Sequence, residues 1–369
     1  MRLVTNSEQE LALEQLQVLY LQACNDIVRF ASSQRCANNV GLHHICYYAI
    51  REKHPALGSQ MVCIAIKQVA SAYKTLLANR KKLKKSDWPE IAFGKSSSVH
   101  FDKRTYSLKD SVLSLFTLQG RIKVALKIGA FQKQYFAAGT PKEAQLVHKK
   151  KGWFFNLVLE LPDTAPVSGN GILGVDLGEN NLAATSSGKL FGGGKLCFER
   201  DKYLHLRGRL QRNGSKSAKQ LLKKVSGKES RHVRHVNHEV SKAIVQEAIN
   251  NNRSVIMMEN LTNIRKRIKA GKRMRSRLHR WAWAQLQQFV EYKAQAVGIR
   301  VEYINPAYTS QTCASCGNIG KRQKHRFFCP FCGRLAHADL NASLNIASLG
   351  VTAVAPTGVV NHPHVAAIC

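Results

Sequence analysis

Apolar residues near the N-terminus recur at steps of three and four positions, which is the period of an amphipathic helix. Between Gln9 and Phe30 these positions are Leu13, Leu16, Tyr20, Cys24 and Ile27. A similar spacing runs from Ser59 to Leu83, where the basic run NRKKLKK and then Asp87-Trp88-Pro89 end it. The pattern predicts two long helices in the first part of the chain.

The pattern then changes to an alternation of apolar and polar residues, as expected for β-strands. The stretch SVLSLFTLQGRIKVALKIG alternates on both sides of Gln119-Gly120, and AQLVHKKKGWFFNLVLELP does so around Lys151-Gly152. Each stretch predicts a β-hairpin, and together they predict a small sheet or barrel. The Pro- and Gly-rich segment PDTAPVSGNG (162–171) then reads as a linker.

Beyond this linker, short apolar segments are separated by long basic ones. ILGVDLG (172–178), NLAATSS (181–187) and KLFGG (189–193) predict three successive strands, and SVIMMEN (254–260) and IRVEYINP (299–306) predict two more. Strands separated by helical stretches indicate an α/β domain with a mixed sheet. A chain of 369 residues is therefore expected to form two or three domains.

The net charge of the chain indicates which kind of molecule it binds. Lys and Arg number 56 against 23 Asp and Glu, a formal charge of +33. Residues 199–280 hold 23 basic and 6 acidic residues, and the tract 264–280 contains no acid. Such an excess is typical of chains that neutralise phosphates, so a polyanion is the expected partner. A membrane is not expected, because we find no apolar run of about 18 residues and no apolar signal core in MRLVTNSEQE.

Four of the ten cysteines form two matched pairs. Cys313 and Cys316 form one C-x-x-C, Cys329 and Cys332 form the other, and each pair is followed by a glycine. This spacing indicates two tight knuckles whose four thiolates close a tetrahedral Zn²⁺ site. Because four sulfur ligands leave no position for water, the zinc is expected to be structural. Two redox pairs or unrelated core thiols are the alternative interpretation.

Three acidic residues stand in unusual places. Asp176 lies within the apolar strand ILGVDLG, Glu259 ends the apolar strand SVIMMEN, and Asp339 opens the final amphipathic run. Taken singly, each has an ordinary explanation, such as an ion pair, or for Asp339 an N-cap. Together they would repel one another unless cations lay between them. Three converging carboxylates suit Mg²⁺ or Mn²⁺, and two such ions can support phosphodiester hydrolysis.

These residues resemble the TnpB family, the transposon-encoded relatives of the compact type V CRISPR effector nucleases. The matching segments are GVDLGENNLAATSSG (174–188), VIMMENL (255–261), YTSQTCASCG (308–317), CPFCG (329–333) and HADLNASLNIA (337–347). They occur in the family's order. The resemblance implies that Asp176, Glu259 and Asp339 are the catalytic acids of a RuvC-like domain.

The resemblance also implies a multidomain α/β architecture. An RNase H-like (RuvC) nuclease domain is expected from residues 169–307 and 337–356, with a zinc ribbon, 308–336, inserted in it. A small wedge-like β-barrel is expected from residues 1–10 and 87–168, interrupted by a helical recognition domain, 11–86. Residues 357–369 are expected to form a tail. The family usually has an extra basic strand before the first helix, where this chain has only MRLVT.

The implied function is RNA-guided cleavage of double-stranded DNA. A guide RNA would pair with one DNA strand while the protein reads a short flanking motif, which fits a large positive channel. We expect Mg²⁺ or Mn²⁺ at the three acids, one chain bound to one RNA, and a location in a prokaryotic cytoplasm, at the nucleoid when bound to DNA. The alternatives are an RNA-guided repressor that no longer cuts, and a RuvC-like resolvase or transposase that needs no guide.

Overall fold

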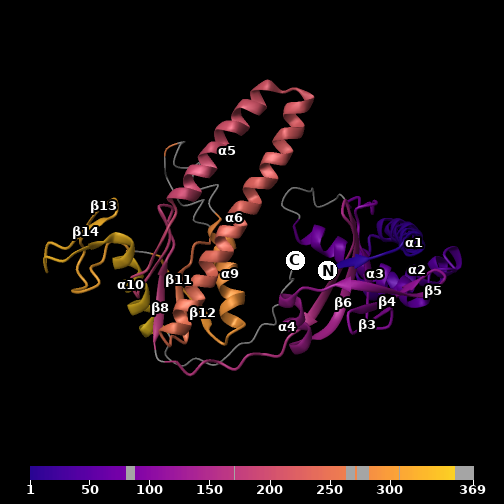
Figure 1. The fold of residues 1–369 in the computed structure, drawn as a ribbon, viewed down its shortest axis with the longest axis horizontal. Coiled ribbons are helices and arrows are strands. Elements are labelled where there is room, and N and C mark those ends of the chain that lie inside the picture. Colours follow the sequence, from indigo (N-terminus) through magenta and orange to yellow (C-terminus); the bar gives the residue numbers. More distant parts are fainter. Residues whose placement is uncertain (80–87, 170, 263–270, 272–281, 307, 354–369) are drawn as a thin grey trace. The chain divides into compact units, whose positions relative to one another are not determined.

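The computed structural model describes residues 1–79, 88–169, 171–262, 271, 282–306 and 308–353 (Figure 1). These residues form a multidomain α/β protein in two compact units, which divide between Pro162 and Asp163, in the segment interpreted above as a linker. The expected tail, 357–369, and nearly all of the acid-free tract 264–280 lie outside the described residues. The two units are described separately.

Three helices form one layer of the first unit. They are α1 (Ser7–Ser33), α2 (Asn39–Lys53) and α3 (Ser59–Ala78), and a short α4 (Ala130–Ala138) follows later. The predicted helices correspond to α1 and α3, and the structure adds α2 and α4, which the spacing of apolar residues did not predict. Asn6 caps α1, since its side chain accepts from the amide of Gln9 at 2.8 Å and the Gln9 side chain accepts in return. Gln9 also donates to the carbonyl of Lys123 on the sheet.

The sheet of the first unit has seven strands in the order β2-β6-β7-β1-β5-β4-β3. Their bounds are β1 Arg2–Val4, β2 Val99–Phe101, β3 Tyr106–Lys109, β4 Val112–Thr117, β5 Gly120–Lys127, β6 Thr140–Lys149 and β7 Gly152–Glu160. The predicted hairpins are confirmed as β4-β5 and β6-β7. The short segment at the N-terminus does form a strand, β1, which pairs with both β5 and β7 in the middle of the sheet.

This sheet curls into a nearly closed barrel. In a flat sheet β3 and β6 would lie five strand spacings apart, about 24 Å. The hydroxyl of Tyr106 in β3 nevertheless donates to the carbonyl of Lys142 in β6 at 3.1 Å. Side chains from the sheet and from α1–α3 fill one common core, among them Trp153, Phe155, Tyr20 and Tyr73. The three helices and the barrel therefore fold as one unit.

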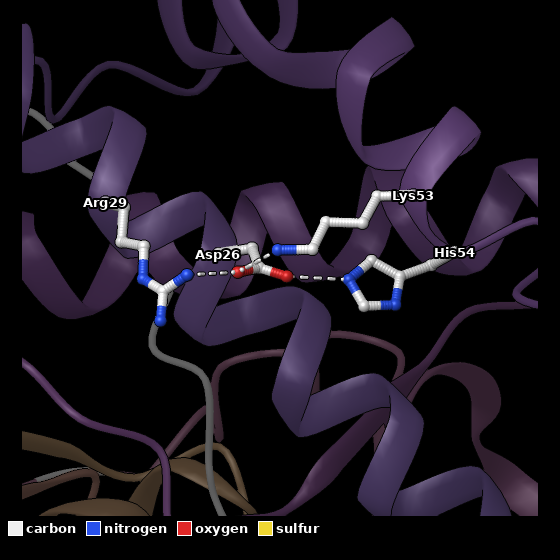
Figure 2. Close-up of polar contacts among 4 residues, drawn as sticks. All are labelled: Asp26, Arg29, Lys53 and His54. Atoms are coloured by element: carbon white, nitrogen blue, oxygen red, sulfur yellow. Dashed lines mark hydrogen bonds and ion pairs between the residues drawn. The ribbon is translucent and has the colours of Figure 1, made fainter.

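A buried carboxylate ties α1 to the end of α2 (Figure 2). Asp26 of α1 is 8% exposed and accepts from Lys53 at 2.8 Å and from Arg29 at 3.1 Å. Its second oxygen lies 2.8 Å from Nε2 of the buried His54, which follows α2. Burial alone raises the pKa of Asp26, but the hydrogen bonds from Lys53 and His54 outweigh it, so the pKa lies below its ordinary value.

The second unit is built on a five-stranded mixed sheet in the order β10-β9-β8-β11-β12. The strands are β8 Ile172–Asp176, β9 Asn181–Thr185, β10 Leu190–Gly192, β11 Val255–Glu259 and β12 Arg300–Ile304. β11 pairs in parallel with both β8 and β12, and β8, β9 and β10 form an antiparallel meander. All five strands predicted from the sequence are confirmed.

Helices cover both faces of this sheet (Figure 1). On one face, α6 (Lys216–Asn250) and α9 (Trp283–Gln295) pack on Leu173, Val175, Ile256 and Met258. On the other face, α10 (Ala338–Ala353) packs its Ile346 against Val255 and Met257. α5 (Gly194–Asn213) joins α6 in a long hairpin, in which Glu229 of α6 pairs with Arg207 and Arg200 of α5.

A small three-stranded antiparallel sheet lies between β12 and α10 in the chain. It consists of β13 (Lys321–Gln323), β14 (Arg326–Phe328) and β15 (Leu335–His337) in that order. The fully buried Phe327 packs with Cys313, Cys329 and Ala338. β15 leads directly into α10, so this sheet is joined without a linker to the helix that carries Asp339.

Within the described residues, one helix is long and apolar enough to cross a membrane by length and composition alone. It is α3, of which about half of the apolar window is buried inside the first unit. The buried residues of α3, such as Met61, Val69 and Tyr73, belong to the core shared with the barrel.

The Asp26 cluster leads to a stability prediction. Asp26→Asn removes the charge shared by three donors and should lower the free energy of unfolding by about 1–3 kcal/mol near neutral pH. Because the folded pKa of Asp26 is below the unfolded value of about 3.9, its contribution is complete above that value and is lost as pH falls through the folded pKa. The difference from the wild type should therefore shrink on acidification.

Urea denaturation of the RNA-free protein from about pH 7 to about pH 3 measures this difference. Glu14→Gln, an exposed position on the same helix, is the control and should change stability little at any pH. A destabilisation by Asp26→Asn that stays constant down to the lowest pH would contradict the assignment.

Candidate active site

Asp176 and Glu259 stand at the carboxyl ends of two adjacent parallel strands. The register pairs Val175 of β8 with Met258 of β11, so the next residues, Asp176 and Glu259, lie side by side. The spacing of parallel strands is about 4.8 Å, and paired residues point to the same face. Leu173 and Val175 pack in the core on the α6 side, which leaves Asp176 on the face covered by α10.

A glycine brings the third acid to this place. A Cβ on Gly174 of β8 would lie 2.1 Å from the carbonyl oxygen of Ser343 and 2.6 Å from the amide nitrogen of Ala347, both in α10. Only glycine therefore allows the helix backbone to cross the strand so closely. Asp339 lies about one turn before Ser343 on this helix, in its first turn. The crossing directs Asp339 toward the end of β8 that carries Asp176.

The contacts of Asp339 identify its surroundings. One carboxylate oxygen accepts from the side-chain amide of Asn181, the first residue of β9, at 2.9 Å. The other accepts from Arg322 of β13 at 2.9 Å. α10 begins at Ala338, and both carboxylate oxygens of Asp339 accept from side chains of other elements, so Asp339 lies inside the helix and is not its cap. The alternative explanation of Asp339 as an N-cap is wrong.

The three acids interact electrostatically. Asp176 is 9% exposed and Asp339 is 8% exposed. Burial, followed by the charges of Glu259 and Asp339, raises the pKa of Asp176 to about 8, and Arg322 opposes this shift. Burial also raises the pKa of Glu259, against a hydrogen bond from Thr309 and the charge of Arg322. This cluster of mutually repelling carboxylates has the donor chemistry that Mg²⁺ or Mn²⁺ prefers.

The four cysteines come together as two similar knuckles. In the first, the amide of Gly317 donates to the carbonyl of Cys313, and in the second the amide of Gly333 donates to that of Cys329. Both glycines have positive φ, +75° and +72°, which favours glycine at the turn after each pair. A hydrogen bond from the backbone of Asn318 lowers the pKa of Cys316 to about 6. The pKa of Cys332 instead rises to about 12, against a hydrogen bond from the backbone of Arg334, because burial and the neighbouring sulfurs disfavour its thiolate. Four thiolates this close together therefore require a cation between them.

The sulfur spacing fits a tetrahedral metal ion. Sγ atoms of Cys313 and Cys332 lie 3.7 Å apart, and those of Cys316 and Cys329 lie 3.5 Å apart. Four sulfurs at about 2.3 Å from a central zinc ion would lie about 3.8 Å from one another. Among the described residues, these cysteines are the only group of three or more His, Cys, Asp or Glu whose ligand atoms all lie within 4.8 Å of one another. Asp176, Glu259 and Asp339 do not form such a group in the structure.

Known protein families and sequences share similarity with this chain. Residues 283–346 match the family model "Cas12f1-like, TNB domain", and residues 156–265 match the model "Probable transposase". A TnpB-like protein of Methanocaldococcus jannaschii is 30% identical over 61% of this chain and 85% of its own length. The chain belongs to the TnpB family. This TnpB protein is also 28% identical, over 86% of its length, to the CRISPR-associated endodeoxyribonuclease Cas12f1 of Sulfoacidibacillus thermotolerans, of which 83% is covered.

A solved structure shares the fold of this TnpB protein. It is the Cas12f1 chain of a Cas12f1-sgRNA-target DNA complex determined by cryo-EM, with a TM-score of 0.61 and 17% sequence identity. The similarity covers 93% of this chain and 83% of that one. At this identity the likeness concerns the fold.

Sequence reasoning missed several polar residues that surround the acids. These are Asn181, Arg322, Thr309, Asn341 and Asn345. One signal was available for the last two, because asparagines four residues apart in the apolar run LNASLNIA share one face of the helix and need partners when buried. No comparable signal marked Thr309 or Arg322, whose partners are distant in sequence.

Gly174 provides a test of the geometry of the site. Gly174→Ala would place a methyl group against the α10 backbone, so the helix must shift, at a cost of about 1–3 kcal/mol or more. We expect a lower midpoint of thermal and urea unfolding. Gly192→Ala in β10, where an added Cβ meets nothing within 4 Å, is the matched control. Equal stability of the two variants would show that α10 does not pack closely on β8.

Proposed function

We propose that this TnpB protein is an RNA-guided DNA endonuclease whose RuvC-like site consists of Asp176, Glu259 and Asp339. The observation that carries the proposal is that these three acids, from β8, β11 and α10, interact at one end of the sheet although the first and the last lie 163 positions apart. Burying like charges together is costly, and a protein retains such an arrangement when cations or substrate use it. The endodeoxyribonuclease relatives support this reading.

The chemistry follows from the donor set. Divalent ions bound at such carboxylates activate a water and stabilise the leaving oxygen in phosphodiester hydrolysis. In this chain Asp176 and Glu259 would hold the ions from the sheet, and Asp339 from α10. The guanidinium of Arg322 faces Asp339, and its positive charge also acts to lower the pKa of Asp176 and of Glu259. Asp176 and Asp339 are buried and Glu259 is partly buried, so the surrounding protein would restrict the positions of these ligands.

We further propose that the four cysteines bind zinc and form a zinc ribbon with β13, β14 and β15. The sulfur spacing and the paired knuckles support this assignment. The ribbon carries Arg322, and its last strand runs into α10, so its folding supports the position of Asp339. Its role in the proposal is structural, because all four coordination positions are filled by sulfur.

The proposed partners are a guide RNA and double-stranded target DNA. The charge of +33 supports contacts with nucleic-acid backbones, to which RNA pairing would add the sequence specificity. The relative of similar fold was solved with an sgRNA and target DNA. We propose a wedge-like barrel from residues 1–10 and 87–168, a helical recognition domain from 11–86, and an assembly of one chain with one RNA.

One experiment separates this function from the alternatives. The protein is expressed with its RNA, the RNA that copurifies is sequenced, and the complex is incubated with Mg²⁺ and plasmids that carry the complementary target beside randomised flanking sequence. Cleavage confined to plasmids with the target is expected. Target binding without cleavage would indicate a repressor, and cleavage of branched or terminal DNA without RNA would indicate a resolvase or transposase.

Asp176→Ala tests the acidic site. Loss of a metal ligand should reduce cleavage by at least about 100-fold, while RNA and target binding stay near the wild-type level, because Asp176 is a buried carboxyl group that does not neutralise phosphates. Asp163→Ala in the exposed linker should cleave normally. Cleavage by Asp176→Ala within a few-fold of the wild type would mean that the acids are misassigned.

Cys313→Ala tests the zinc assignment. The wild type should contain stoichiometric zinc by elemental analysis, and the variant should lose it together with part of its thermal stability, since metal binding is coupled to folding of such sites. Cys36→Ala, at a thiol outside the cluster, should keep both. Normal zinc content in Cys313→Ala would exclude this ligand set.

A further inference from the structure

We propose that Thr309 is a positioning residue for Glu259, and that Asn341 and Asn345 of α10 hold Thr309 in place. The proposal rests on the proposed nuclease function, because it concerns how a ligand of the Mg²⁺ site is oriented. Thr309 lies four residues before Cys313, in the segment that connects β12 to the cysteine cluster.

The contact with Glu259 is direct. Thr309 is 3% exposed, and its hydroxyl donates to Oε1 of Glu259. The carbonyl of Pro306 lies 3.3 Å from the same hydroxyl, but a hydroxyl has one proton and the charged acceptor forms the stronger bond. With one carboxylate oxygen held, the side chain cannot rotate freely, and Oε2 stays available for a metal ion. A hydrogen bond of this kind orients a ligand in metal sites generally.

The backbone of Thr309 is held by α10. The side-chain amide of Asn345 donates to the carbonyls of Thr309 at 2.8 Å and of Thr312 at 2.7 Å. Asn341 donates to the carbonyl of Thr312 at 2.6 Å and accepts from the amide of Ala314 at 3.0 Å. Asn341 is 0% exposed and Asn345 is 7% exposed, so water does not compete for these hydrogen bonds.

A strained residue next to Thr309 supports this view. Tyr308 has φ +64°, in the left-handed region that residues with side chains rarely adopt, and its carbonyl accepts from the amides of Gln311 and Thr312. Such strain persists where the surrounding structure determines the conformation, and it is common at functional sites. The turn directs the Thr309 hydroxyl to Glu259, while the chain continues to Cys313.

These contacts join the three parts of the site. α10 supplies Asp339 as a ligand. Its Asn341 and Asn345 also hydrogen-bond to the segment that contains Thr309 and so help to position Glu259. The same segment begins the first cysteine knuckle. Orientation of Glu259 thus depends on α10 and on the segment leading to the cysteine cluster as well as on its own strand.

The test compares Thr309→Val, which keeps the shape but removes the donor, with Thr309→Ser, which keeps the hydroxyl. Binding of MnCl₂ to the protein–RNA complex is measured by electron paramagnetic resonance, and cleavage is measured over a range of Mg²⁺ concentrations. We expect Thr309→Val to weaken Mn²⁺ binding and to raise the Mg²⁺ requirement by about 10- to 100-fold. Thr309→Ser should stay within a few-fold of the wild type.

Two further variants serve as a control and as a second test. Ser310→Ala removes a hydroxyl from the residue next to Thr309, and the hydroxyl that donates to Glu259 is that of Thr309, so Mn²⁺ binding should not change. Asn345→Leu removes the hold on Thr309 and should weaken Mn²⁺ binding in the same direction as Thr309→Val. Zinc content and melting temperature, measured for every variant, detect loss of folding.

The outcomes separate this proposal from the proposed function. If the wild type cleaves and Thr309→Val matches it in Mn²⁺ binding and Mg²⁺ requirement, the positioning role is overturned. If Thr309→Val lowers Mn²⁺ binding only together with zinc loss and a lower melting temperature, Thr309 has a general structural role and the proposal is likewise overturned. If the wild type does not cut DNA but Thr309→Val selectively weakens Mn²⁺ binding, the positioning role stands and the nuclease function fails.

Discussion

The close crossing of α10 over β8 at Gly174 is the constraint on which the candidate site depends. The strand backbone and the helix backbone approach so closely there that no side chain fits between them. This contact fixes where Asp339 lies along β8, and the neighbouring parallel strand places Glu259 beside Asp176. The three acids therefore meet because of backbone packing, which tolerates little adjustment.

Polar contacts orient the side chains of the acids, whose backbone positions are set by the packing of α10 on the sheet. Carboxylates that repel one another need donors and cations to hold them, and Arg322, Asn181 and Thr309 provide the donors in this structure. All three come from different elements, and the segment that carries Thr309 is held by asparagines of α10. The cysteine cluster is joined to the site at both ends, through the segment 309–314 before it and α10 after it. The cysteine cluster and the candidate catalytic site thus share one set of contacts.

Much of the local structure could be predicted because its signal is local. The strands of the second unit stand out as short apolar runs, and both hairpins of the first unit are marked by turn residues between alternating segments. Other elements have only a weak local signal, for physical reasons. β1 has only three residues and gains its stability from pairing with β5 and β7, and α2 buries few side chains, so its apolar period is weak. Tertiary contacts, not local pattern, determine these elements.

The sequence by itself determined which residues are candidates for the chemistry: four cysteines at knuckle spacing, three acids in apolar contexts, and a positive charge suited to nucleic acid. Residue type and spacing fix ligand chemistry, and both can be read along the chain. Only the tertiary structure decided that Arg322 faces Asp339, that Thr309 donates to Glu259, and that Gly174 admits α10. These contacts join residues from 17 to 173 positions apart, and their geometry depends on how the sheet and helices pack, which no local pattern encodes.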